Sequence, residues 1–358
     1  MHRKGWSQRL ALLAAKTPMV PRNQQRPKPA LQTPCQGRER AGVTVATMSA
    51  TPFAPLTLGT AAMLTIAPLL WAGNAVVGRL AADWIPPMTF NFLRWLVALA
   101  ILLPLAAWVL RRHSGLWQHW RRFALLGLLA IAGYNSLQYL ALHTSTPINV
   151  TLVAASMPVW MLIIGRLFFG AAITRQALLG SALSLLGVLV VLTQGQVQRI
   201  LELQLVPGDA WMLLATCTWA LYSWLLTRRD EPAPIRADWS AFLMAQIIFG
   251  LFWSAALSAG EWVLWPAATG TPLPQIDWSW ALLAVLVFVG LGPGVIAYRF
   301  WGEGVQRAGP TVAAFFSNLT PLLAALMSAA LLREPPQAFH VAAFALIVAG
   351  IAVSSLRR

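Results

Sequence analysis

The stretch PINVTLVAASMP, residues 147–158, has a counterpart 163 positions later in PTVAAFFSNLTP, residues 310–321. The same shift brings two further pairs of glycines into register, Gly127 with Gly290 and Gly187 with Gly350. Glycine and proline constrain the backbone, and the residues between these landmarks are apolar in both copies. Their shared spacing therefore predicts one helical unit used twice, in residues 123–191 and 286–354.

Composition indicates a membrane protein. Hydrophobic residues make up 58% of the 358 residues, charged residues only 10%, and there are 18 tryptophans. The formal charge of +15 does not indicate a nucleic-acid partner, because nearly all basic residues outside the N-terminal tail lie between or at the ends of apolar runs, where they orient membrane helices. Two cysteines, Cys35 and Cys217, provide neither a disulfide framework nor a metal site, and we expect no cofactor.

Apolar segments of about 20 residues, the length that crosses a bilayer, follow one another from residue 58 onward. We count ten, at residues 58–80, 88–110, 123–142, 146–170, 175–194, 208–226, 238–262, 278–301, 308–332 and 337–356. Several linkers are very short, so consecutive helices must run antiparallel. The sequence predicts an all-α integral membrane protein with ten transmembrane helices.

The segments divide into two repeats, 58–194 and 208–356, joined by a linker at 195–207. Residues 1–47 form a polar, Pro-rich, basic tail that cannot bury enough apolar surface to fold alone. Two interpretations of this tail stay open. It is either a disordered cytoplasmic extension or the product of a start codon assigned too early, with Met48 as the true start.

The arginines predict the orientation, because short basic loops remain cytoplasmic. With both termini inside, only Arg79, Arg199 and Arg333 lie in outer connections, and the remaining loop arginines are cytoplasmic. Each repeat holds five helices, and an odd number reverses direction. The two halves should therefore be inverted about an axis in the membrane plane, with a substrate site near the midplane between them.

The chain resembles the EamA-type transporters of the drug/metabolite transporter superfamily. The resemblance covers residues 58–356 and depends on short segments in a fixed order. They are WAGN at 71–74, FNFLRW at 90–95, the segment between two prolines at 147–158, WALY at 219–222, the segment between two prolines at 310–321, and LRE at 332–334. In this family the unit usually ends in an acidic residue, which is present here in the second half as Glu334, whereas the matching position of the first half is Ala171. This departure counts against a transport role for the carboxylate in both halves and favours a role in capping backbone N–H groups at a helix start.

The resemblance implies a multi-pass permease of the bacterial inner membrane, a monomer or homodimer, that moves a small metabolite such as an amino acid by alternating access. Export is favoured because of the family. Efflux of drugs or toxic compounds is the alternative within this class.

Polar and aromatic side chains inside the spans are the candidate substrate-binding residues, since they must face a partner or a cavity. The candidates are Trp71, Asn74, Tyr134, Asn135, Gln138, Asn149, Ser156, Trp219, Tyr222, Tyr298 and Asn318. One interpretation is an aromatic cavity with a few amide and hydroxyl groups. The other is that each polar group bonds a neighbouring helix, contributing about 0.6 kcal/mol.

Three further features of the spans bear on mechanism. Arg94 lies about 9 Å into the second span. Three roles are open to it: its side chain extends to the outer interface, pairs with the carbonyls of a neighbouring helix, or holds a substrate carboxylate. Pro158 and Pro321 permit kinks and are either hinges for alternating access or static kinks. No acid falls clearly mid-span, which favours facilitated diffusion or a less obvious coupling group over a single-glutamate proton antiport.

The sequence lacks the signatures of other functional classes of membrane protein. An intramembrane enzyme needs a Ser-His pair, paired aspartates or a zinc cluster, and none is visible, so we predict no catalytic residues. A scaffold or receptor would be expected to carry a folded soluble module. No nucleotide-binding motif occurs in the sequence, which argues against ATP-driven transport.

Overall fold

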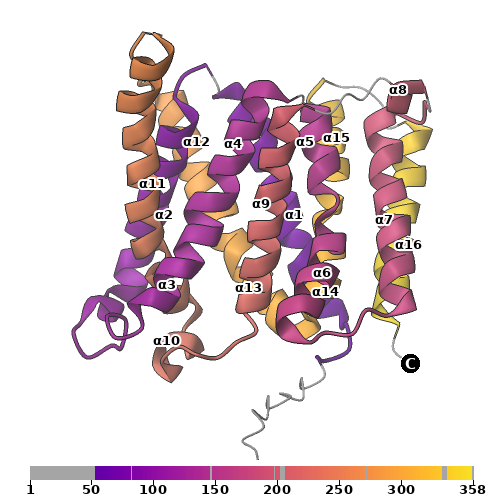
Figure 1. Cartoon of the computed structure of the whole chain (residues 1–358), viewed down its shortest axis with the longest axis horizontal. Helices are drawn as coiled ribbons and strands as arrows, with labels where there is room; N and C mark the ends of the chain where they lie inside the picture. The colour runs from indigo at the N-terminus through magenta and orange to yellow at the C-terminus, as the bar shows by residue number, and fades with distance from the viewer. Residues whose placement is uncertain are drawn as a thin grey trace, which may run out of the picture. The chain divides into compact units, whose positions relative to one another are not determined.

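The computed structural model describes residues 53–356 except 82, 146, 197, 202–205, 271 and 333–336. Within these residues the chain is helical and contains no strand (Figure 1). The expected tail at residues 1–47 and the carboxylate at position 334 lie outside the described residues.

The helices follow one another along the chain with short connections (Figure 1). In order they are α1 (Leu58–Leu80), α2 (Pro87–Ala106), η1 (Ala107–Leu110), α3 (Trp120–Leu126), η2 (Gly127–Gly133), α4 (Tyr134–Thr144), α5 (Pro147–Ala154), α6 (Met157–Phe169), α7 (Arg175–Thr193), α8 (Gln198–Leu201), α9 (Pro207–Leu225), α10 (Ala233–Ala237), α11 (Trp239–Thr269), α12 (Trp280–Val289), η3 (Gly290–Ile296), α13 (Ala297–Ala308), α14 (Pro310–Ser317), α15 (Leu319–Leu332) and α16 (Ala338–Ser355). Figure 1 shows α8 at one end of the bundle and α10 at the other, and we call these the α8 end and the α10 end.

Nine stretches of the described residues are long and apolar enough to cross a membrane. They correspond in order to the expected spans except for the sixth, which is the helix α9. This helix has 19 residues, but Asp209 and several Trp, Thr and Ser residues lower its mean hydropathy. The chain is therefore an α-helical, multi-pass membrane protein.

Two π-helical segments, η2 and η3, begin at Gly127 and Gly290, which are 163 residues apart. Both glycines lie where another helix approaches closely. A Cβ on Gly127 would lie 2.6 Å from the carbonyl oxygen of Gln246 in α11, and one on Gly290 would lie 3.0 Å from the carbonyl oxygen of Arg94 in α2. The repeated glycine thus marks a repeated close contact between helices.

The expected fourth and ninth spans are each divided in two. A break separates α5 from α6 just before Pro158, and another separates α14 from α15 just before Pro321. Proline has no N–H to donate, so carbonyls near such a break need other partners. The Asn318 amide, at the second break, donates to the Ala155 carbonyl at the first (3.3 Å) and to the Ser184 hydroxyl (2.9 Å). The two broken helices are therefore joined at their breaks.

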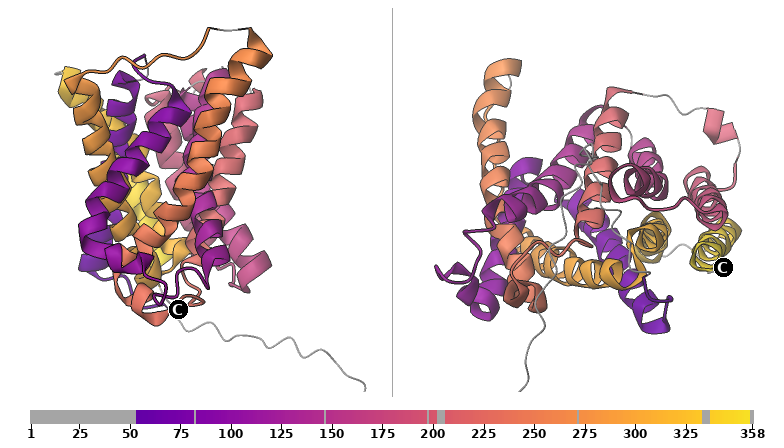
Figure 2. Two further views of the ribbon diagram at one scale, coloured as in Figure 1. Left: turned by 90° about the vertical axis from the view of Figure 1, so that its left-hand side faces the viewer. Right: turned by 60° about the horizontal axis from the view of Figure 1, so that its bottom comes forward.

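Helices from opposite halves lie side by side. The most extensive helix–helix contacts are those of α7 with α16 and of α2 with α11 (Figure 2). Some expected boundaries change. α11 extends to Thr269, beyond the expected end at residue 262, and α13 extends to Ala308, beyond the expected end at residue 301. The expected linker at 195–207 contains the short helix α8.

Candidate functional site

A cavity of about 670 Å³ lies within the helical bundle and is lined by residues from both halves. Its lining includes Gly78 near the end of α1 and Pro87 at the start of α2. The α1–α2 connection lies at the α8 end (Figure 1), so one end of the cavity is there. The volume is within the range of small-molecule sites.

A cluster of aromatic residues bounds one side of this cavity. Trp71, Trp219 and Tyr298 line it, and behind them lie the buried Trp301 and Tyr222, which do not. Ring centroids are 5.3 Å apart for Trp71 and Trp219, 5.5 Å for Trp219 and Tyr298, and 5.2 Å for Trp219 and Tyr222. Several pairs meet edge to face, an arrangement that stabilises aromatic clusters. We call these five residues the aromatic floor.

Two hydrogen bonds hold the aromatic floor in place. The Tyr298 hydroxyl donates to the Ala130 carbonyl in η2 at 2.8 Å, and the Trp301 indole donates to the Ser223 hydroxyl at 3.2 Å. Buried Tyr and Trp need such partners for their polar atoms. The floor is therefore a fixed apolar surface facing the cavity.

Amide and hydroxyl groups line other parts of the cavity. The sequence-predicted residues found there are Asn74, Tyr134, Asn135, Gln138 and Asn318, and Pro321 also lines it. The structure thus brings most of the predicted polar residues to the same cavity as Trp71, Trp219 and Tyr298.

Three predicted residues lie away from the lining. The Asn149 amide donates to the Asp209 carboxylate at 3.3 Å, and the Ser156 hydroxyl donates to the Val153 carbonyl of its own segment. Tyr222 is buried behind Trp219. Of the two predicted hinge prolines, Pro158 lies off the lining.

Sequence reasoning missed Tyr139, Thr151, Ser317 and Thr320, which all line the cavity. Tyr139 follows Gln138 directly, and Ser317 precedes Asn318, so both adjoin predicted residues. The signal that could have found them is polar character within a span next to a candidate.

No Asp or Glu lines the cavity among the described residues. The intramembrane acids have structural partners instead. The Glu261 carboxylate accepts from the backbone N–H groups of Met88 (2.9 Å) and Thr89 (2.8 Å) at the start of α2, and the Asp209 carboxylate accepts from the Val206 N–H at 2.9 Å. No metal-ligating cluster of His, Cys, Asp or Glu occurs in the described part of the chain.

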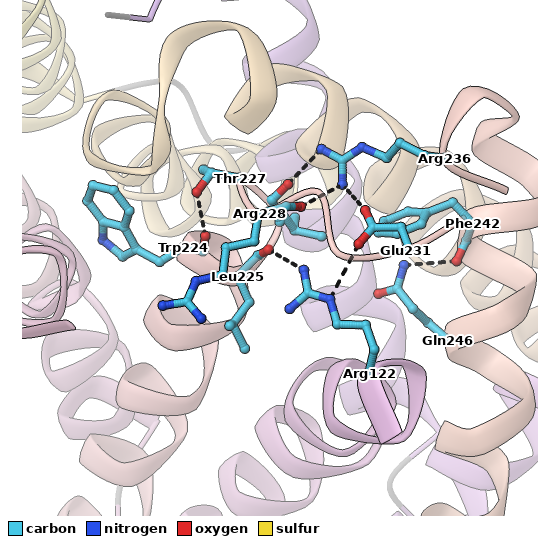
Figure 3. Close-up of polar contacts among 10 residues, drawn as sticks. Arg122, Trp224, Leu225, Thr227, Arg228, Glu231, Arg236, Phe242 and Gln246 are labelled. Carbon is cyan, nitrogen blue, oxygen red and sulfur yellow. Dashed lines mark hydrogen bonds and ion pairs between the residues drawn. The ribbon is translucent and has the colours of Figure 1, made fainter. Parts of the chain in front are cut away.

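An ion cluster lies at the α10 end, opposite the cavity's α8 end (Figure 3). Glu231 pairs with Arg122 at the start of α3, with Nε 3.4 Å from Oε2, and with Arg236 in α10. The same arginines donate to carbonyls at the C-terminal end of α9, Arg122 to Leu225 and Arg236 to Leu226, the residue that follows the helix. Cations stabilise the C-terminal end of a helix dipole. The cluster therefore ties α3 to α9 and α10.

The sequence matches the EamA-like transporter family over residues 58–193 and 206–356, nearly all of the described chain. The chain belongs to this family. The EamA match divides at the connection between α7 and α9, where the two predicted repeats meet.

Curated relatives carry transporter names. The uncharacterized transporter YyaM of Bacillus subtilis (strain 168) is 26% identical over 65% of this chain and 72% of its own. The aromatic amino acid exporter YddG of Ancylobacter novellus is 27% identical over 80% of this chain and 94% of its own. A crystal structure with 22% identity and a TM-score of 0.64 covers 83% of this chain and 96% of the other, and it shares the fold. The EamA family and these relatives indicate transport rather than an enzymatic reaction.

Proposed function

We propose that this EamA-family chain is a secondary transporter that moves a small metabolite through the central cavity by alternating access. The observation that carries the proposal is the cavity itself. It holds about 670 Å³, draws its lining from both halves, and combines an aromatic floor with amide and hydroxyl groups. Such a surface orients a small ligand with an apolar body and a polar end.

The proposal includes ten spans, with α9 as the sixth. Its 19 residues are long enough to cross a bilayer. Asp209 and Thr216 lie buried within the bundle, and α9 packs against α4 and α6. Most of the residues that lower its mean hydropathy, including Asp209, Thr216 and Ser223, therefore do not face lipid, whereas Trp211 is 45% exposed.

An inverted repeat is supported by the pattern of helix contacts. α1 packs against α13 and α15, and its proposed counterpart α9 packs against α4 and α6. The π-helical starts at Gly127 and Gly290 correspond in the same way. With the arginine-rich α10 end placed in the cytoplasm, both termini are cytoplasmic. The proposed location is the bacterial inner membrane, since the relative YedA of Escherichia coli (strain K12) is named an inner membrane transporter.

Alternating access requires the α10 end to open. Two features support that motion: the ion cluster around Glu231 is the kind of contact that can separate, and the breaks before Pro158 and Pro321 can act as hinges. Replacing both prolines by alanine restores N–H donors and is expected to slow transport without unfolding the protein. An unchanged transport rate in that double variant would remove the hinge role.

The proposed substrate is an amino acid or a related compound with an aromatic or bulky apolar side chain. The aromatic floor carries this choice, and the relative YddG is named an aromatic amino acid exporter. Export is the proposed direction. Efflux of drugs is the second candidate, favoured by the same aromatic surface.

The test is flux into proteoliposomes that contain the full chain, with a panel of labelled amino acids and hydrophobic drugs, with and without a pH gradient. Saturable flux that falls in the Asn74→Ala variant supports the cavity as the path, and its response to the gradient identifies proton coupling. Saturable flux that Asn74→Ala leaves intact would place the path elsewhere. Absence of flux for every compound would contradict the proposed function.

A further inference from the structure

Arg94 is an arginine within a membrane span that lines the cavity and is only 3% exposed. Among the described residues its guanidinium has one hydrogen bond, from Nη1 to the Asn74 side-chain oxygen, at a long 3.5 Å. Its Nε is buried without a partner. The guanidinium also lies 5.0 Å from the Trp95 ring centroid. Arg94 therefore carries a buried positive charge whose donors are largely unused.

Four other arginines of the described chain pair with carboxylates, whereas Arg94 does not. Arg122 and Arg236 share Glu231, and Arg299 and Arg307 share Glu303. No carboxylate of the described chain lies within ion-pair distance of Arg94. A buried charge is costly unless it is paired, and residues retained inside a membrane at such a cost mark ligand or ion sites.

Arg94 is the single charged side chain among the described residues that line the cavity. Among the described residues, the lining therefore carries one positive charge and no carboxylate to pair with it. We propose that Arg94 anchors the carboxylate of the substrate, and that the cavity takes aromatic or apolar organic carboxylates. This inference rests on the proposed transport function and names its substrate class.

The shape of the guanidinium favours a carboxylate. Its planar fork of N–H donors matches the two carboxylate oxygens, and such charge-assisted pairs are stronger than neutral hydrogen bonds. The aromatic floor lies on the same cavity and receives the apolar body. For an ammonium group the described lining offers neutral oxygens, such as those of Asn74 and Gln138, and aromatic faces, but no carboxylate. The carboxylate, rather than the amine, is thus the required group.

The first experiment measures ligand recognition by the unmodified full chain in detergent, using tryptophan fluorescence quenching. The probes are phenylalanine, 3-phenylpropionate, phenylalaninamide and phenethylamine. Phenylalanine and 3-phenylpropionate should bind with similar affinity, and the two compounds without a carboxylate should bind at least about tenfold more weakly. Equal binding of the amide and the acid would overturn the inference, and this result does not depend on the folding of any variant.

The second experiment compares variants in the same assay and in flux. Arg94→Gln should lose at least about tenfold in affinity for 3-phenylpropionate, and Arg94→Lys, which keeps the charge but not the fork, should lose less. Arg299→Gln removes an arginine from an exposed pair and should leave the affinity unchanged. Saturable flux that is indifferent to Arg94 and to the carboxylate would overturn the inference alone. Absence of flux across the whole panel would overturn the proposed function and the inference with it.

Discussion

Arg122 Nε lies 3.4 Å from the Glu231 carboxylate, and this buried pair joins the start of α3 to the loop between α9 and α10. The Glu231 side chain is fully buried and also pairs with Arg236 (Figure 3). The two arginines cap the last carbonyls of α9. One acid thus holds together three segments at the α10 end.

Glu231→Gln should destabilise the protein, because it removes the one carboxylate that pairs directly with both mostly buried guanidinium groups and leaves Arg122 only the nearby charge of Asp230. We expect a loss of about 3 kcal/mol, the cost of breaking a buried ion pair from one side. Thermal unfolding in detergent measures it. The matched control is Glu303→Gln, whose partners are 41% and 49% exposed and whose loss should stay below about 1 kcal/mol. Equal effects of the two substitutions would contradict a structural role for the buried cluster.

The same substitution should ease opening of the α10 end. A cysteine in place of the fully buried Ser223, in a chain whose two native cysteines are replaced, reports on access from that end. We expect Glu231→Gln to raise its labelling rate by an impermeant maleimide in inside-out vesicles. Unchanged labelling would show that the cluster does not keep this end closed.

The Asn318 amide connects the two helix breaks, so Asn318→Ala should cost about 1 to 3 kcal/mol by leaving the Ala155 carbonyl unpaired. Thermal unfolding is again the measurement. Ser317→Ala provides the neighbouring control, because the Ser317 hydroxyl bonds the Ala314 carbonyl of its own helix. A shift no larger than that of the control would mean that the breaks are held by packing alone.

Trp71 joins the aromatic floor and faces the cavity, so Trp71→Ala should weaken binding of an aromatic ligand at least about tenfold. Equilibrium binding of labelled phenylalanine measures the change. Trp280 is 86% exposed and is the matched control, for which binding should be unchanged. If both variants bind alike, the ligand does not contact the floor.

Asp238 begins α11 by accepting from the N–H groups of Ser240 (2.9 Å) and Ala241 (3.3 Å) and from the Trp108 indole (3.2 Å). Partial burial acts to raise the pKa of the Asp238 carboxyl, but these hydrogen bonds together with that from the Ser240 hydroxyl outweigh it, so the pKa lies below its ordinary value of 3.8. The stabilisation is complete above that value and is lost as the pH falls through the lowered folded-state pKa.

The stability difference between the native chain and Asp238→Asn should therefore be constant near neutral pH and shrink below about pH 4. Melting temperatures measured across that range check it. Asp277 is an exposed aspartate, and Asp277→Asn is the matched control. A difference for Asp238→Asn that persists undiminished in acid would contradict the charge-dependent cap.

Local pattern predicted the candidate site only in part. Asn74, Tyr134 and Gln138 could be selected because polar groups inside a span need a cavity or a partner, and all three line the cavity. Asn149 and Ser156 are seven residues apart and would share a face of an intact helix. The break before Met157 interrupts that periodicity. The Asn149 amide donates to the carboxylate of Asp209, which comes from a distant part of the chain.

Some features could not be recognised from sequence at all. From the sequence, Glu231 would be predicted to be a solvent-exposed loop residue near several arginines. Only the packing of α3 against the end of α9 buries it. Arg94 was open to three roles, and its depth along the helix could not separate them. The observation that supports the proposed substrate-anchoring role is that no carboxylate of the described chain pairs with Arg94, which is a property of neighbouring helices.

The sequence by itself determined the helical membrane class and the spacing of the repeated glycines and prolines. These depend on the length of apolar runs and on backbone constraints, both of which are local. Only the tertiary structure decided which side chains face the cavity, which carboxylates accept hydrogen bonds at helix starts, and which arginine lies without a carboxylate partner among the described residues. Helical periodicity fixes angles within one helix, but partners come from other helices, and their rotation and depth are set by packing.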